Sequence, residues 1–90
     1  MRKLVRNVKV KNALGLHTRP AATIVKLLQA FKSAVTFTCR NETINARSIM
    51  SILMLAARKN TVVTITIEGV DAEAAMTRLV GAFESEFGER

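Results

Sequence analysis

The hydrophobic residues of this 90-residue chain change their spacing several times, and these changes of period constrain the fold more than any other feature. Val35, Phe37 and Cys39 alternate with polar residues, which is the pattern of a half-buried strand. From Thr18 onward the apolar residues instead recur at helical spacing: Ala21, Ile24, Val25, Leu28 and Phe31. A short chain that contains both periods is expected to form one domain in which helices cover a sheet.

Along the whole chain, the two periods predict seven elements in the order strand, helix, strand, strand, helix, strand, helix. The predicted strands are residues 4–10, 35–40, 43–46 and 61–67, with a hairpin turn at Asn41-Glu42. Three helices are predicted. The first begins at Thr18, with Pro20 in its first turn, the second follows an N-cap at Ser48, and the third follows a cap at Asp71. The last helix carries a buried stripe of Met76, Leu79, Val80, Phe83 and Phe87. We therefore predict an α+β fold with one domain over residues 1–90, a largely antiparallel sheet with its helices on a single face.

The composition is that of a globular domain, with 49% hydrophobic and 23% charged residues. A chain of this length buries one modest core and cannot also enclose a large cofactor pocket. No apolar run approaches the roughly 20 residues of a membrane span, and no apolar segment of a signal peptide follows the basic N-terminus. Cys39 is the single cysteine, which fits a reducing compartment. We expect a cytoplasmic protein without a cofactor and without membrane insertion.

The charge is high and uneven. The formal net charge is +7, with +11 carried by residues 1–59 and −4 by residues 60–90. Such an asymmetry predicts an anionic ligand or partner, which could be a phosphate group, a nucleic acid or an acidic protein surface.

The most informative position for chemistry is His17, the only histidine, which follows Gly15-Leu16 at the start of the first predicted helix. Free backbone N–H groups at a helix N-terminus, together with the helix dipole, bind anions. The same positive end disfavours a charged imidazolium and favours the neutral, nucleophilic ring. Arg19 lies two residues further on and could hold phosphate oxygens with its forked donors. These groups suffice for accepting a phosphoryl group.

The residues alone also allow His17 to be an ordinary loop residue or a helix cap. A metal site is not expected, because one histidine and one distant cysteine supply too few ligands.

Two motifs resemble those of a known family. The segment Gly15-Leu16-His17-Thr18-Arg19-Pro20-Ala21-Ala22 is similar to the active-site signature of HPr, the histidine-containing phosphocarrier of the bacterial phosphoenolpyruvate-dependent phosphotransferase system. Asn45-Ala46-Arg47-Ser48-Ile49-Met50 resembles the family's second signature, around a regulatory serine. Asn12 and the segment Gly69-Val70-Asp71-Ala72 also match, so the resemblance covers essentially the whole chain.

The resemblance implies an open-faced β-sandwich and a stoichiometric phosphocarrier rather than a turnover enzyme. His17 would accept a phosphoryl group on Nδ1 from Enzyme I and pass it to enzyme IIA proteins, for sugar uptake and its regulation. Arg19 would steady the phosphate, with the backbone N–H of Thr18 as a further donor. A monomer is expected, with no nucleic-acid partner.

The resemblance also implies a docking surface beside His17. Ile49, Met50 and Leu53 would form its apolar part, ringed by Arg19, Lys26 and Arg47, and we expect Ile49 and Met50 to point outward and Ile52 and Leu55 inward. Ser48 would be an N-cap and also a possible phosphorylation site for a dedicated kinase, the HPr kinase/phosphorylase of this family.

Three alternative functions stay open. The C-terminal Phe87-Gly88-Glu89-Arg90 and the Leu53-Met54-Leu55 run resemble the nitrogen-related branch of the family, which feeds a regulatory chain. A basic nucleic-acid-binding domain is favoured by the pI of 10.6, although the chain has no Trp or Tyr for stacking on bases. A regulatory binding domain in which His17 is never phosphorylated is the third.

Overall fold

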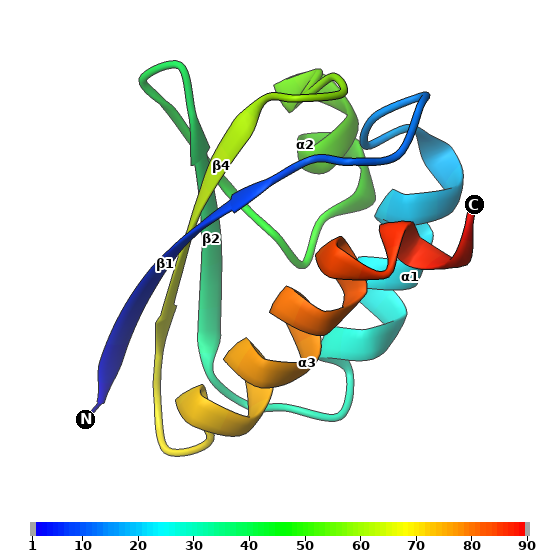
Figure 1. Cartoon of the computed structure of the whole chain (residues 1–90). Helices are drawn as coiled ribbons and strands as arrows, with labels where there is room; N and C mark the ends of the chain where they lie inside the picture. Colours follow the sequence, from blue (N-terminus) through cyan, green and yellow to red (C-terminus); the bar gives the residue numbers. More distant parts are fainter. Residues whose placement is uncertain (1, 90) are drawn as a thin grey trace.

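The computed structural model describes residues 2–89. Its elements are β1 (Lys3–Lys9), α1 (Thr18–Leu28), β2 (Ala34–Cys39), β3 (Glu42–Asn45), α2 (Ile49–Leu55), β4 (Val62–Glu68) and α3 (Ala72–Glu84), followed by a 3-10 turn, η1 (Glu86–Gly88). The four strands form one antiparallel sheet in the spatial order β1-β4-β2-β3. The three helices lie on the same side of this sheet (Figure 1). The predicted element order and fold class, an open-faced β-sandwich, are confirmed.

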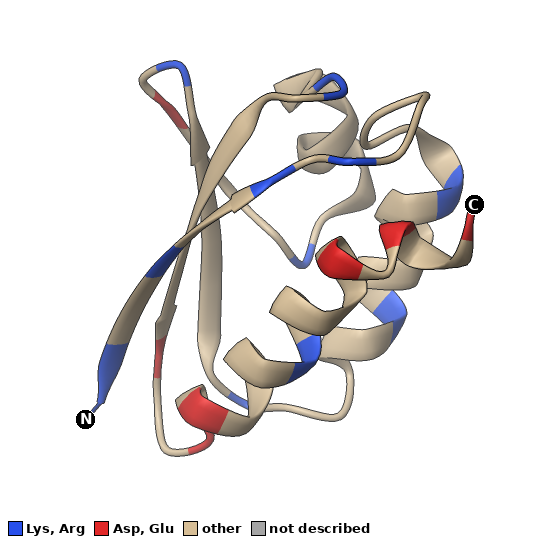
Figure 2. Cartoon of the chain, in the orientation of Figure 1, with Lys and Arg blue, Asp and Glu red and all other residues tan. Residues whose placement is uncertain are grey.

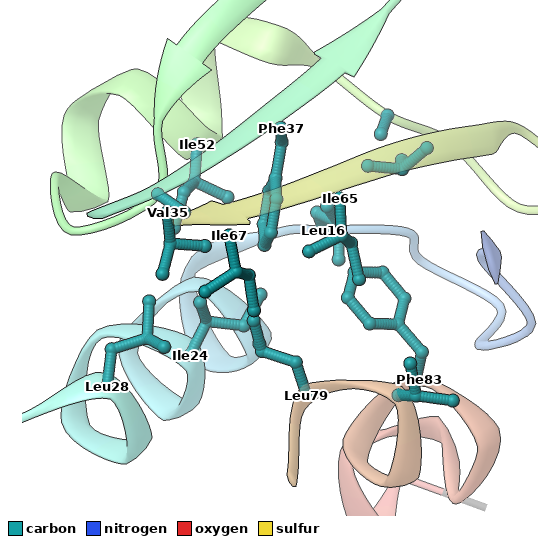
Figure 3. Packing of buried hydrophobic residues seen from close by; sticks show 14 of the residues in the cluster. Leu16, Ile24, Leu28, Val35, Phe37, Ile52, Ile65, Ile67, Leu79 and Phe83 are labelled. Carbon is teal, nitrogen blue, oxygen red and sulfur yellow. The ribbon is translucent and has the colours of Figure 1, made fainter. Parts of the chain in front are cut away.

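The core lies between the helices and the covered face of the sheet. Val63, Ile65 and Ile67 of β4 are fully buried, and the intervening threonines face the open side, as predicted. Phe37 of β2 meets Phe83 of α3 edge to face, with ring centroids 5.9 Å apart (Figure 3). Leu16 belongs to the same core and is only 3% exposed. The loop that precedes α1 is therefore anchored in the hydrophobic core directly before His17.

The strands differ from the predicted ranges by one residue, and local turns change the end of α1 and the position of the hairpin turn. Helix α1 ends at Leu28, and the N–H groups of Gln29, Ala30 and Phe31 each bond to the carbonyl three residues back, so Phe31 lies in a tightened last turn. The hairpin turn is Arg40-Asn41, with φ of 48° and 67°, rather than Asn41-Glu42. A two-residue turn with positive φ at both central residues matches the twist of the paired strands.

The end of α3 also differs from the prediction. The helix stops at Glu84, and Phe87 lies in η1 with φ +55° instead of continuing the helical stripe. Phe87 still packs against Phe83, with ring centroids 4.9 Å apart. Left-handed backbone at Glu86, Phe87 and Gly88 turns the chain back toward α1.

Asp71 occupies the N-cap position of α3 but makes no side-chain cap hydrogen bond, which corrects its predicted role. Its carboxylate instead accepts hydrogen bonds from the N–H groups of Lys32 and Ser33 and from the Ser33 hydroxyl. Asp71 thus ties the loop before β2 to the start of α3. Within residues 2–89, no helix combines the length and apolar character that crossing a membrane requires.

Candidate functional site

His17 is the N-cap residue of α1, with extended backbone (φ −78°, ψ −169°) and a half-buried side chain. The loop before it is fixed by the hydrogen bond from Leu16 N–H to Ala57 O, 2.9 Å long. Gly15 has φ +67°, and a Cβ there would lie 2.4 Å from Ala57 O. Glycine is required at this position both for its backbone conformation and for the close approach of the two chain segments.

The first turn of α1 presents two backbone donors. The first intrahelical bond runs from Ala21 N–H to His17 O, and Pro20 has no N–H. Among the contacts of the described residues, the N–H groups of Thr18 and Arg19 have no acceptor, and His17 provides no side-chain cap. Two donors at the positive end of a helix are therefore available for an anion.

The imidazole of His17 is held by a carboxylate from the far end of the chain. His17 Nε2 lies 3.1 Å from Oε1 and 2.9 Å from Oε2 of Glu89, whose side chain is only 15% exposed. Asn12 Nδ2 donates to the same Oε1 at 2.9 Å and to Gly15 O at 2.7 Å. A flipped Asn12 amide would place its oxygen against two acceptors, so the orientation of this buried residue is determined.

These contacts define the charge of Glu89. Partial burial of the carboxyl raises its pKa. Hydrogen bonds from His17 and Asn12, together with the positive charge of His17 and Arg19, lower it by more, so the pKa of Glu89 lies below its usual value. An ionised carboxylate only accepts hydrogen bonds, so Nε2 of His17 carries the proton. Arg19 and Glu89 line one shallow hollow of about 210 Å³ together with Ala13 and Leu14.

Helix α2 carries an exposed apolar surface, and one of its residues, Leu53, lines a hollow with His17. Met50 is 67% exposed and Ile49 38%, whereas Ile52 and Leu55 are buried, so the predicted orientations within α2 are confirmed. The sequence argument missed Leu14 and Met54, each 75% exposed. Half-buried Leu53 lines a second hollow, of about 190 Å³, in which it meets Leu14, Leu16, His17 and Arg58. We call Leu14, Ile49, Met50, Leu53 and Met54 the apolar patch.

The remaining predicted site residues lie further away. Ser48 is the N-cap of α2, and its Oγ accepts a hydrogen bond from Ser51 N–H at 3.2 Å, as predicted for a cap. Lys26 is exposed in the last turn of α1, about 13 Å along the helix from His17.

Arg47 lies at the far end of the same helix. Its guanidinium donates to the carbonyls of Leu28, Phe31 and Ser33 at 2.7–2.9 Å. Leu28 is eleven residues from His17, about 16 Å along the helix axis, so the structure does not bring Arg47 beside His17.

Among residues 2–89 there is no group of three or more side chains that could hold a metal ion. Glu89 is a site residue that no sequence pattern could identify, because its contact with His17 spans 72 positions and depends on the left-handed turn at residues 86–88.

Comparison with known proteins identifies the family. The profile described as "PTS HPr component phosphorylation site" matches residues 4–85. The phosphocarrier protein HPr of Chlamydia muridarum is 48% identical over 80 residues, which are 89% of this chain and 77% of that one. The crystal structure titled HPr-C-His from Thermoanaerobacter tengcongensis superposes with a TM-score of 0.90 at 39% identity, covering 100% of this chain and 99% of that one. A structure described as an HPr dimer from the same organism gives a TM-score of 0.77 at 41% identity over 91% of this chain and 94% of that one. The chain therefore belongs to the HPr family of phosphocarriers of the phosphotransferase system.

Proposed function

We propose that His17 accepts a phosphoryl group, derived from phosphoenolpyruvate, from Enzyme I on its Nδ1 atom and passes it to a histidine of enzyme IIA proteins that serve sugar uptake. One observation carries this proposal. Glu89 holds the proton on Nε2 of His17, whereas no contact of the described residues involves Nδ1. In the neutral ring the lone pair is then on Nδ1, and the two residues that follow His17 begin α1 with free N–H donors.

The transfer balances without an added base. The lone pair of Nδ1 forms the new N–P bond while the N–P bond of the donor phosphohistidine breaks, and that electron pair returns to the donor ring. The His17 ring keeps its proton on Nε2 and gains positive charge, which the Glu89 carboxylate stabilises at 2.9 Å. The N–H groups of Thr18 and Arg19 and the Arg19 guanidinium would receive the phosphoryl oxygens. Transfer to enzyme IIA is the same step in reverse.

Docking would use the apolar patch. Met50 and Met54 have flexible, polarisable side chains, which suit a surface that has to fit an Enzyme I and several enzyme IIA proteins in turn. Arg19 and Arg58 would border the patch and steer acidic partner surfaces toward it. Because the partners complete the site, the chain would act as a stoichiometric carrier, and we expect it to do so as a monomer in the cytoplasm.

Ser48 is proposed as a regulatory site. Its hydroxyl caps α2 immediately before Ile49 and Met50 of the apolar patch. A phosphate added there by a serine kinase would bring about −1.5 to −2 charges next to the docking surface and would repel an acidic partner.

The proposal is tested by intact-protein mass spectrometry after incubation with phosphoenolpyruvate, Mg²⁺ and the cognate Enzyme I. One acid-labile phosphate is expected on the wild-type protein and none on His17→Ala. Arg19→Ala is expected to become phosphorylated more slowly at the same final stoichiometry. An unmodified wild-type protein, or an equally modified His17→Ala variant, would contradict the assignment. Preference for an Enzyme I of the sugar or of the nitrogen branch would decide which chain of reactions this carrier serves.

A further inference from the structure

One hollow on the described surface lies away from His17, beside the first half of β2. It is a groove of about 430 Å³, and its walls include Lys32, Ser33, Val35, Thr36, Asn45 and Arg47. Strand β3 pairs with β2 only from Thr36 onward, so on this side of β2 there is a gap beside Ala34 and Val35, which is crossed by one hydrogen bond, from Ala46 N–H to Val35 O. The groove occupies this gap. Its volume falls within the range of about 300–1,000 Å³ that is typical of small-molecule sites.

The groove contains positive charge without a counter-charge. Lys32 and Arg47 both line it, no acidic residue does, and neither cation forms an ion pair with another residue of the range 2–89. The carboxylate of Asp71 lies near this segment, but it accepts hydrogen bonds from the Lys32 and Ser33 N–H groups and is not part of the groove wall. In Figure 2 the acidic residues of the nearby elements lie at the two ends of α3, at the end of β4 and at the hairpin end of β3, whereas the groove lies at the other end of β3, at Asn45.

Arg47 is held in place before any ligand arrives. Three of its five guanidinium N–H groups donate to the carbonyls of Leu28, Phe31 and Ser33, which leaves two donors. The backbone N–H of Arg47 donates to Asn45 Oδ1, so the Asn45 Nδ2 group is a further donor at the groove. A half-buried guanidinium fixed by three hydrogen bonds loses little side-chain entropy when it binds an anion.

The groove also has an apolar part. Exposed Ala34 and the methyl group of half-buried Thr36 line it along β2, whereas the side chain of Val35 between them is only 2% exposed and belongs to the hydrophobic core. A free inorganic ion would not use these groups.

We propose that this groove is a binding site for a small organic anion, one that has a phosphate or carboxylate group and a short apolar body. The anionic group binds Arg47, Lys32 and the Asn45 amide, and the apolar body packs on Ala34 and the methyl group of Thr36. The site is independent of phosphoryl transfer at His17, which lies at the opposite end of α1.

The test is a titration of the ¹⁵N-labelled protein, followed by amide chemical shifts, with three probes: phenyl phosphate, benzoate and inorganic phosphate. Phenyl phosphate is expected to bind with a dissociation constant of about 1 mM and to shift the amides of residues 32–36 and 45–47. Benzoate should shift the same amides if the site accepts either anionic group. Inorganic phosphate should bind at least roughly threefold more weakly than phenyl phosphate, because it cannot use the apolar part of the groove.

Lys32→Met is the informative variant, because the Lys32 side chain makes no hydrogen bond in the described structure and its loss leaves the fold intact. It should weaken phenyl phosphate binding roughly three- to tenfold. Lys9→Met, on β1 at the other edge of the sheet, is the matched control and should bind like the wild type. Three results would each overturn the proposal. These are equal weakening of phenyl phosphate binding in Lys32→Met and Lys9→Met, equal affinity for inorganic phosphate and phenyl phosphate, and shifts at residues 9–11 and 58–59 as large as those at the groove.

Discussion

Replacing Arg47 by methionine tests whether this residue belongs to the fold or to a docking surface. The substitution keeps most of the apolar stem and removes three hydrogen bonds from a cation to carbonyls at the end of α1. Each is worth about 1 kcal/mol net at a half-exposed site. The expected loss is therefore about 3 kcal/mol, a large fraction of the roughly 5–13 kcal/mol that hold a 90-residue domain together.

The assay is urea and thermal unfolding followed by circular dichroism. Arg47→Met should lower the Tm by roughly 12–24 °C, since about 1 kcal/mol corresponds to about 4–8 °C in a domain of this size. Lys26→Met is the control, because Lys26 is an exposed cation at the same helix end and no hydrogen bond or ion pair of its side chain is described. Its free energy of unfolding should change by no more than about 0.5 kcal/mol. A loss below about 1 kcal/mol for Arg47→Met would refute this reasoning. Below its unfolding temperature the variant should accept phosphate at the wild-type rate, and a large loss of rate would instead assign Arg47 to partner binding.

Three further outcomes are expected. Glu89→Ala should slow phosphorylation of His17 about tenfold, and ¹⁵N shifts of the imidazole should show a mixture of the two neutral tautomers, with the proton on Nε2 or on Nδ1. Glu89→Gln, whose carbonyl still accepts from Nε2, should restore the wild-type tautomer, and an unchanged tautomer in Glu89→Ala would remove Glu89 from the mechanism. Hydrogen bonds from the Ser33 hydroxyl and the Lys32 N–H hold the pKa of Asp71 below its ordinary value of 3.8. The contribution of Asp71 to stability is therefore complete above that pH and is lost as the pH falls through the lower folded-state value. Acid unfolding of Asp71→Asn should depend less on pH below about 4 than that of the wild type, and parallel curves would contradict this. Ser48→Asp should weaken Enzyme I binding at low salt and much less at high salt, while an unchanged affinity at low salt would refute the proposed regulation.

The fold could be predicted from the sequence wherever one face of an element is buried. Strand β4 and helix α2 show this best, because burial alternates along Val62–Glu68 and Ile52 and Leu55 turn inward as their spacing predicts. The ends of elements could not be predicted in the same way. Phe87 has helical spacing from Phe83, yet the chain leaves the helix at Glu84, since tertiary contacts of the tail decide the backbone there.

The candidate site was predictable only in its local part. His17, Thr18 and Arg19 are neighbours in sequence, and their position at a helix start follows from the period that begins at Thr18. The contact of Glu89 with His17 and Asn12 depends on where the last turn places the tail, which no local pattern specifies. Arg47 was expected in the ring around the docking surface, but its guanidinium donates instead to the carbonyls of Leu28, at the end of α1, and of Phe31, just beyond it.

The measurement that tests the central claim most directly is the identification of the phosphorylated nitrogen. Protein labelled with ¹⁵N in its single histidine would be phosphorylated by Enzyme I and examined by NMR for coupling between phosphorus and the ring nitrogens. Phosphorus coupled to Nδ1 of His17, with the proton still on Nε2, is the predicted result. Phosphorus on Nε2 would contradict the role assigned to Glu89, and an unmodified His17 would contradict the carrier function itself.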